Sequence, residues 1–298
     1  MSAQLSTIAD FIRFSYSRMN AEKLFFGHGT DNAWDESVAL VLQTLNLPWD
    51  FARDLWGCAL TEGERVSVLE NIDARISKRT PLAYLTKQAY FCGLKFYVDE
   101  RTLVPRSPIA QLISNGFAPW LLNEPSRVMD LCTGSGCIGI ATALVFEDAE
   151  VDLLDISTDA LDVARINIDA FDLQDRVTAI ESDCFSALDA SFEHQYDLIV
   201  SNPPYVDAED IASMPDEFRQ EPMLGLASGQ DGLDFTRKML AGARRFLSDQ
   251  GVLIAEVGNS WEALELAFPD LEFTWLDFEH GGHGVFMLTA DQLKAVES

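Results

Sequence analysis

The sequence lacks both a long apolar run and a C-x-x-C pair of cysteines. No stretch approaches the roughly 20 consecutive apolar residues that a membrane-spanning helix needs. Residues 1–20 contain no uninterrupted apolar core and no small-residue cleavage site, so we do not expect a secretory signal. The five cysteines are odd in number and never spaced C-x-x-C, which is typical of reduced core thiols. We therefore expect a cytoplasmic protein that is not attached to a membrane.

Basic residues are scarce in the second part of the chain. The whole sequence has 21 Lys and Arg against 48 Asp and Glu, a net charge of −27. Through residue 110 the count is 12 against 13, a net of −1, whereas residues 111–298 hold 9 against 35, a net of −26. A surface this acidic repels nucleic acid and attracts basic partners. It can equally be a well-solvated surface, and the charge by itself leaves both explanations open.

The spacing of apolar residues predicts helices in the first part of the chain. One helix ends before Pro48 and is capped by Asp31 or Asn32, and another spans 64–76. Two short strands at 90–93 and 95–98 then turn at Gly93-Leu94. We predict a helical substrate-recognition domain over 1–85, a β-hairpin linker over 86–109 and a larger domain over 110–298.

Strands and helices alternate from about residue 110 onward. The predicted strands cover 127–131, 151–155, 176–183, 196–202 and 251–258. This order indicates a mostly parallel, Rossmann-like α/β sheet that is covered by helices on both faces. Two further strands, 273–280 and 284–289, are separated by Gly281-Gly282 and predict an antiparallel edge pair. A plain dinucleotide-binding fold has no such pair, because its strands are all parallel.

A glycine-rich loop follows the first of these strands and opens a helix. It contains a literal G-x-G-x-x-G at residues 134–139. Glycine is needed where a ligand lies against the backbone, and the helix that follows offers free N–H donors to an anionic group. The candidate cofactor-binding residues of this segment are Asp130, Cys132, Thr133, Gly134, Ser135 and Gly136.

Acidic residues end the next two strands. Asp155 stands where a carboxylate can accept both hydroxyls of a ribose, which a nicotinamide dinucleotide and S-adenosylmethionine explain equally well. Asp183 ends the third strand and suits an adenine amino group, and Phe185 is positioned to cover the ring. This second acid favours S-adenosylmethionine as the cofactor.

The fourth strand leads into Asn202-Pro203-Pro204-Tyr205. The prolines stiffen the backbone and lack N–H donors, so their carbonyls can accept hydrogen bonds. Asn202 Oδ1 and the Pro203 carbonyl can each take one hydrogen of a planar –NH2 group, and Tyr205 adds an aromatic face and a hydroxyl. An amide nitrogen held in this way can build charge as it attacks an electrophilic methyl group. We predict catalytic roles for Asn202, Pro203 and Tyr205, and substrate contacts for all four residues. Asn202 is also expected to contact the cofactor.

These motifs identify a resemblance over essentially the whole chain. The sequence resembles the class I methyltransferases that methylate glutamine in translation proteins, and within them the branch that acts on large-subunit ribosomal protein three. Three segments are similar to that branch: 27–34, 130–137 and 106–109. The release-factor branch usually carries an acidic run at the place of 106–109. Residues 221–234 also fit the family, as an ordered segment near the pocket. The resemblance implies methyl transfer from S-adenosylmethionine to a glutamine of a basic ribosomal protein.

Other functions fit less of the sequence. An adenine-amino DNA methyltransferase would use the same Asn-Pro-Pro-Tyr motif, but it needs a basic face for phosphates, and this domain is acidic. A release-factor glutamine methyltransferase stays the alternative within the family, and a scaffold without catalysis would be expected to have lost Asn202 or the glycine loop. His280 and His283 flank a predicted turn and have no cysteine partner, so we do not expect a metal site.

Overall fold

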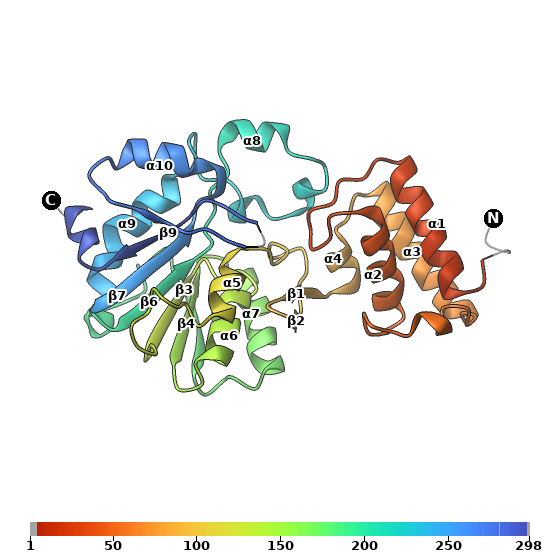
Figure 1. Cartoon of the computed structure of the whole chain (residues 1–298), viewed down its shortest axis with the longest axis horizontal. Coiled ribbons are helices and arrows are strands. Elements are labelled where there is room, and N and C mark those ends of the chain that lie inside the picture. The colour runs from red at the N-terminus through yellow and green to blue at the C-terminus, as the bar shows by residue number, and fades with distance from the viewer. Residues whose placement is uncertain (1–4, 280, 297–298) are drawn as a thin grey trace. The chain divides into compact units, whose positions relative to one another are not determined.

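The computed structural model describes residues 5–279 and 281–296. The chain forms two compact units (Figure 1). The helical unit consists of Met1–Ala89 together with Pro215–Gln220, and the α/β unit consists of Tyr90–Met214 together with Glu221–Ser298. The predicted division at residues 85 and 109 stays a prediction.

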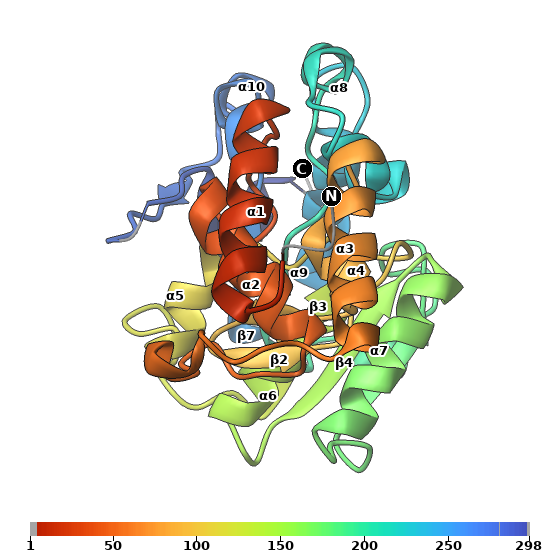
Figure 2. The ribbon, with the colours of Figure 1, turned by 90° about the vertical axis from the view of Figure 1, so that its right-hand side faces the viewer.

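The helical unit is built from helices with strong N-terminal caps. Asn32 accepts a hydrogen bond from the Asp35 backbone, and Thr7 and Thr61 each form a capping box with an acidic residue three positions later. Of the two predicted caps, Asp31 and Asn32, it is therefore Asn32 that caps α2. Figure 2 shows the three longer helices of this unit packed beside one another. The elements are α1 (Ile8–Ala21), α2 (Ala33–Thr44), η2 (Arg53–Leu55), α3 (Glu62–Ser77), α4 (Leu82–Thr86) and η4 (Phe218–Gln220).

An arginine lies at the centre of the helical unit. Arg75 of α3 is 1% exposed, and its Nε donates to Glu36 of α2 at 2.5 Å. Its guanidinium also donates to the Phe25 carbonyl and lies 3.6 Å from Glu217. Glu217 in turn accepts a hydrogen bond from the Phe25 backbone. Because an unpaired buried charge costs several kcal/mol, these contacts explain why residues 215–220 belong to this unit.

The α/β unit contains a small hairpin and a large mixed sheet. The strand order in the large sheet is β5-β4-β3-β6-β7-β9-β8. The pairs from β5 to β7 are parallel, whereas β9 runs antiparallel to both β7 and β8. The hairpin strands are β1 (Ala89–Phe91) and β2 (Leu94–Phe96), and those of the sheet are β3 (Arg127–Leu131), β4 (Glu150–Asp155), β5 (Val177–Glu181), β6 (Tyr196–Ser201), β7 (Leu247–Glu256), β8 (Thr274–Trp275) and β9 (Val285–Thr289).

Helices cover both faces of the sheet (Figure 1). Side chains alternate along each strand, so that Val128 packs against α5 and α6 on one face whereas Met129 packs against α9 on the other. The helices are α5 (Ile109–Ser114), α6 (Cys137–Val145), α7 (Thr158–Ala170), α8 (Ala208–Ser213), α9 (Asp234–Phe246) and α10 (Trp261–Ala267), with short 3-10 turns at η3 (Ala190–Phe192), η5 (Met223–Gly225), η6 (Gly258–Ser260) and η7 (Gln292–Val296). None of the helices in the described part of the chain is long and apolar enough to cross a membrane.

The strand order reverses direction between β3 and β6. From β3 the chain adds β4 and β5 on one side, and then β6 and β7 on the other. Helices that leave neighbouring strands in opposite directions open a crevice at the carboxyl ends of those strands. The loops that follow Leu131 of β3 and Ser201 of β6 flank this crevice.

The predicted α/β alternation and antiparallel edge are confirmed, and two details are wrong. The hairpin turns at Cys92-Gly93, one residue earlier than predicted, because both residues adopt left-handed backbone conformations with φ of 51° and 74°. The predicted strand at 273–280 is much shorter, since β8 covers Thr274–Trp275 and the Leu276 backbone adds one hydrogen bond to Val285 of β9. His280, the last residue of that prediction, lies outside the described residues.

Candidate active site

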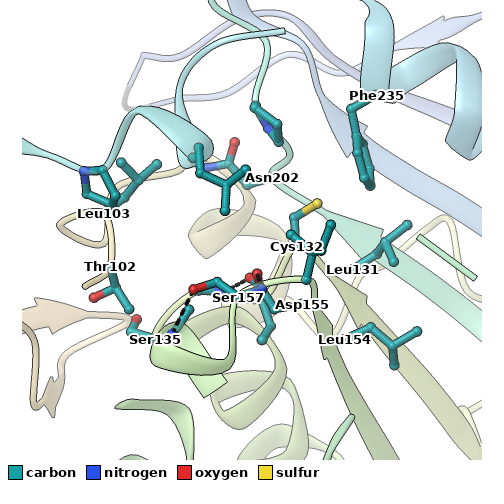
Figure 3. A pocket seen from close by; sticks show the side chains of 18 of the residues that line it. Thr102, Leu103, Leu131, Cys132, Ser135, Leu154, Asp155, Ser157, Asn202 and Phe235 are labelled. Atoms are coloured by element: carbon teal, nitrogen blue, oxygen red, sulfur yellow. Dashed lines mark hydrogen bonds between the residues drawn. The ribbon is translucent and has the colours of Figure 1, made fainter. Parts of the chain in front are cut away.

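A cavity of about 400 Å³ lies in the α/β unit at the carboxyl ends of the parallel strands (Figure 3). Its volume is in the range that holds a cofactor-sized ligand. One wall is made by the loop after β3, together with Asp155 and Ser157 after β4. Asn202 and Phe235 lie across from it. Residues from the segments 101–107 and 222–229 also contribute to the lining.

The glycine loop presents its backbone to this cavity. Of the residues predicted to bind the cofactor, Cys132, Thr133, Gly134 and Ser135 line the cavity, whereas Gly136 lies at the start of α6 outside the lining. Gly134 has a φ of 56°, and a Cβ there would meet no atom within 4 Å, so the loop backbone is open to a ligand. A side chain at Gly136 would instead press on Leu153 and Ala164, which shows that this glycine serves helix–sheet packing.

Asp155 closes the loop from the end of β4. Its Oδ2 accepts from the Gly134 backbone and its Oδ1 from the Ser157 backbone, both at 2.9 Å. Burial raises the pKa of Asp155, and the N–H groups of Ser157 and Gly134 act in the opposite direction. Each oxygen keeps a lone pair for a ligand hydroxyl, so the geometry fits the predicted ribose contact.

Asp130 differs from its predicted role as a direct cofactor ligand. Its side chain is fully buried and is not part of the cavity lining. Oδ2 accepts from Thr133 Oγ1 at 2.5 Å and from the Gly139 backbone at 2.8 Å, so the residue fastens the loop to α6 from beneath. Sequence position alone placed it near the ligand, but the alternation of side chains along β3 directs it into the protein.

Asp183 lines the cavity, and Phe185 does not. Asp183 forms an ion pair with Lys238 of α9 at 2.5 Å, with both side chains about half exposed. The Phe185 ring stacks on Phe246, with centroids 5.0 Å apart, and lies against Gly242. The left-handed backbone at Cys184 (φ 56°) turns the chain after Asp183, which directs Phe185 under α9 and corrects the prediction.

Phe235 is the aromatic residue that lines the cavity instead. It belongs to the first turn of α9, and Figure 3 shows its ring beside the cavity. Sequence reasoning missed it because no strand end or motif marks this position. The nearest signal was its place directly after residues 221–234, the segment expected near the pocket.

The Asn-Pro-Pro-Tyr motif divides into two parts. Asn202 and Pro204 line the cavity, whereas Pro203 and Tyr205 are not part of the lining, and Pro203 is buried. The Tyr205 hydroxyl donates to Glu256 Oε1 at 2.7 Å, and burial raises its pKa. Asn202 Nδ2 donates to the Arg106 carbonyl at 3.3 Å. The position of Tyr205 therefore does not support its predicted direct role in chemistry, whereas Asn202 lines the cavity and its predicted contacts stay a prediction.

Asn167 is a second residue that the sequence did not indicate. It is fully buried on α7, and its Nδ2 donates to the Ser135 carbonyl at 2.8 Å and to the Tyr97 carbonyl at 3.0 Å. Its Oδ1 accepts from the Tyr97 backbone. One side chain thus joins the glycine loop to the segment after the hairpin, and no local motif announces such a contact.

The described residues contain no group of three His, Cys, Asp or Glu side chains arranged to hold a metal ion. His283, which the sequence placed beside a glycine turn, pairs through Nε2 with Asn259 Oδ1 at 3.0 Å. The other histidine of that turn, His280, lies outside the described residues.

The sequence and the fold are similar to those of known methyltransferases. The sequence profile of the "Methyltransferase small domain" family matches residues 114–218, which include the glycine loop, Asp155, Asp183 and Asn202. The hMettl16 catalytic domain, solved in complex with a MAT2A 3'UTR hairpin, has a TM-score of 0.50 at 14% identity, covering 78% of this chain and 83% of that one. At that identity the likeness concerns the fold alone.

The fold and the cavity define an S-adenosylmethionine-dependent methyltransferase of class I. Two ribosomal protein uL3 glutamine methyltransferases are each 48% identical to this chain. The match to the protein from Francisella tularensis covers 97% of this chain and 92% of that protein. The match to the protein from Neisseria gonorrhoeae covers 99% of this chain and 98% of that protein. The chain belongs to the family of ribosomal protein uL3 glutamine methyltransferases. The resemblance inferred from the motifs is confirmed.

Proposed function

We propose that this protein transfers a methyl group from S-adenosylmethionine to the side-chain amide nitrogen of a glutamine in ribosomal protein uL3. One observation supports methyl transfer to an amide: Asn202 lines the same cavity as Asp155 and the glycine loop, at the point where the strand order reverses. A cofactor held by the loop and a substrate amide held by Asn202 would share one enclosure. The relatives named above support the choice of substrate.

The chemical difficulty is the weak nucleophilicity of an amide nitrogen, whose lone pair is delocalised into the carbonyl. The cofactor supplies an electrophilic methyl group. Asn202 Oδ1, and by our proposal the Pro203 carbonyl, accept the two amide hydrogens and favour the positive charge that builds on nitrogen. With the cofactor bound, its methyl group would pass from sulfur to the amide nitrogen, the bonding electron pair would stay on sulfur, and one amide proton would pass to water. Alignment and electrostatics suffice, with no covalent enzyme intermediate.

We propose that the cofactor is held from two strand ends. Asp155 would accept hydrogen bonds from the ribose hydroxyls, through lone pairs that are not used by the Gly134 and Ser157 backbone N–H groups. Asp183 would accept a hydrogen bond from the adenine amino group. One of its carboxylate oxygens is paired with Lys238, and the other would take the amino group. Phe235, in place of Phe185, would cover the ring face.

We propose further that the substrate is free uL3, or uL3 early in ribosome assembly, and that the helical unit helps to hold it in the cytoplasm. A ribosomal protein is basic because it binds RNA, and residues 111–298 of this enzyme carry a net charge of −26. Opposite charges raise the rate of encounter. Once the basic surface of uL3 is covered by RNA, the same acidic enzyme would be repelled.

Tritiated S-adenosylmethionine tests the activity. Purified unmethylated uL3, a peptide release factor and duplex DNA would each be incubated with the enzyme, and the labelled product digested and sequenced by mass spectrometry. We expect label only in uL3, on one glutamine side chain. Label in the release factor or in the DNA, with none in uL3, would overturn the substrate assignment.

Replacing Asn202 separates binding from chemistry. Asn202→Ala removes the substrate acceptor but leaves the glycine loop and Asp155 in place. We expect kcat to fall by roughly two orders of magnitude or more, because removal of a transition-state hydrogen bond typically costs that much. Cofactor affinity, measured by calorimetry, should stay nearly unchanged. Asn115→Ala, at an exposed position after α5, is the matched control and should keep full turnover.

A further inference from the structure

Asn202 is held by a short segment that crosses the wall of the cavity. We call residues 104–107 the strap. Pro105, Arg106 and Ser107 of the strap line the cavity, and the Arg106 carbonyl accepts the hydrogen bond from Asn202 Nδ2. An amide can flip by exchanging its oxygen and nitrogen, but a flipped Asn202 would set its oxygen against the Arg106 carbonyl. The strap therefore keeps Nδ2 on its own side and leaves Oδ1 as the acceptor for a substrate.

The strap is fixed at its first residues by a buried carboxylate. Glu221 is 3% exposed, and its Oε1 accepts from the Val104 backbone at 2.9 Å. The Arg106 guanidinium donates to both oxygens of Glu221, with each bond 2.6 Å long. Such a two-bond arginine–carboxylate pair fixes direction as well as distance. Glu221 thus holds the residue whose carbonyl orients Asn202.

The far end of the strap is fixed by a second buried carboxylate. Glu256, at the end of β7, accepts from Ser107 Oγ at 2.6 Å and from the Tyr205 hydroxyl at 2.7 Å. The strap and the end of the Asn-Pro-Pro-Tyr motif are therefore tied to the same side chain. With both ends of the strap held, the Arg106 carbonyl between them has little freedom to move.

We propose that Glu221 is a positioning residue for methyl transfer, which acts through Arg106 and the strap to keep the Asn202 amide in the orientation that accepts the substrate. The proposal rests on the function proposed above, because it assigns Asn202 Oδ1 to the substrate amide. Glu221 does not contact the reacting atoms by this proposal, and its effect is on the geometry of the group that does.

Glu221→Gln tests the proposal with little change of shape. Glutamine can accept from only one side of the Arg106 guanidinium, so the strap loosens while the cavity keeps its lining. We expect kcat for uL3 to fall about tenfold or more, since small errors of alignment cost rate steeply. The KM for uL3 and the Kd for S-adenosylmethionine should stay within about twofold of wild type, a division that a general loss of structure would not produce.

Two further measurements keep the result interpretable. Arg106→Lys preserves the charge but loses the paired geometry, so it should also lower kcat, and the double variant should be no slower than the slower single variant. The side-chain NH2 signals of Asn202 in the ¹⁵N-labelled protein, assigned by their loss in Asn202→Ala, should shift in Glu221→Gln without any substrate present. The matched control is Asp152→Asn, which breaks a largely buried arginine–carboxylate pair with Arg127 that lies outside the cavity lining.

The outcomes separate the two proposals. If wild-type enzyme does not methylate uL3, the proposed function fails, and the Asn202 signals still report whether Glu221 orients that amide. If wild type is active and Glu221→Gln keeps its kcat, or if Asp152→Asn loses as much kcat, the positioning role is overturned. A drop in kcat confined to the strap variants, together with shifted Asn202 signals, is the expected result.

Discussion

Asp155 combines two tasks in one carboxylate, because it fastens the glycine loop and faces the cavity. Asp155→Ala removes the proposed ribose acceptors along with the Gly134 and Ser157 contacts. Charge-assisted hydrogen bonds contribute about 1.5–3 kcal/mol each, so we expect cofactor affinity to fall at least tenfold in calorimetry. Asp162→Ala, which removes an exposed carboxylate from neighbouring α7, should leave the affinity unchanged. Equal affinities in wild type and Asp155→Ala would remove Asp155 from the cofactor site.

Asp130 gives the fold a dependence on pH. Burial raises the pKa of this carboxyl from 3.8 to about 7, against the opposing hydrogen bonds of Thr133 and Gly139. Between those pH values the folded protein holds a proton on Asp130 that the unfolded chain has lost. The stabilisation from this group is therefore fully present below about pH 4 and is lost as the pH rises through 7.

Asp130→Asn makes that dependence measurable. Asparagine does not titrate, and its oxygen can still accept from Thr133 or Gly139. Compared with wild type, the variant should gain about 1–3 kcal/mol in the free energy of unfolding between pH 5 and pH 7.5, since one pKa unit corresponds to about 1.4 kcal/mol. Urea denaturation of both proteins across this range, without ligand, provides the test. Parallel curves would mean that Asp130 is already ionised in the folded protein at pH 5.

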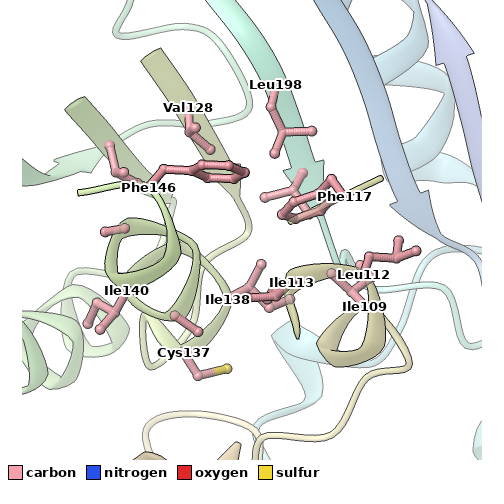
Figure 4. Packing of buried hydrophobic residues seen from close by; sticks show 14 of the residues in the cluster. Ile109, Leu112, Ile113, Phe117, Val128, Cys137, Ile138, Ile140, Phe146 and Leu198 are labelled. Atoms are coloured by element: carbon pink, nitrogen blue, oxygen red, sulfur yellow. The ribbon is translucent and has the colours of Figure 1, made fainter. Parts of the chain in front are cut away.

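At the scale of elements, α6 must approach the sheet closely to present the glycine loop. Ile138 and Ile140 of this helix belong to the apolar cluster in Figure 4, which also includes Val128 and Leu198 from the sheet. A Cβ at Gly139 would overlap the Leu153 side chain and press on Asp130. The absence of a side chain at this helical position sets the distance between helix and sheet.

Gly139→Ala should therefore destabilise the protein even though alanine favours helix. Overpacking a core costs about 1–3 kcal/mol, which exceeds the gain of at most about 1 kcal/mol in helix propensity. We expect a lower Tm by calorimetry and weaker cofactor binding, because the loop shifts with the helix. Gly63→Ala in α3 is the control, since a Cβ there meets no atom within 4 Å and should leave the Tm unchanged or slightly raised. If both variants change the Tm by the same amount, the close packing of α6 on the sheet does not require a glycine at residue 139.

At the scale of the whole molecule, the net charge of −27 is the dominant feature. Electrostatic screening acts over about 30 Å at 0.01 M salt and about 10 Å at 0.1 M. If the acidic surface attracts free uL3, kcat/KM should fall steeply between these two conditions while kcat at saturating uL3 changes little. Initial rates measured with purified components across the salt series would show this. A kcat/KM that is insensitive to salt would mean that the charge serves solubility alone.

The state of the substrate can be tested in the same assay. Intact large subunits from cells that lack the methyltransferase should be poor substrates beside equimolar free uL3, because RNA then covers the basic surface of the protein. Equal rates on the two forms would contradict the proposal of early modification. The methyltransferase activity itself does not depend on this outcome.

The sequence by itself determined the succession of strands and helices along the chain, the glycine loop after β3 and the place of Asn202 after β6. These features are local: alternating apolar residues define a strand, glycines permit the left-handed turn at residue 134, and two prolines stiffen the loop after β6. Each is encoded within about ten residues. The family resemblance rested on short segments as well, among them 27–34, 106–109 and 221–234, which is why it could be recognised without a structure.

Only the tertiary structure decided which side chains face the cavity and what holds them. Phe185 follows a strand end as expected, yet a left-handed turn directs it under α9 and leaves Phe235 at the cavity. Arg106 and Glu221 are 115 residues apart, and nothing in either neighbourhood marks them as partners. Local pattern fixes the path of the backbone, whereas the direction of a side chain and its distant contacts follow from how the elements pack against one another.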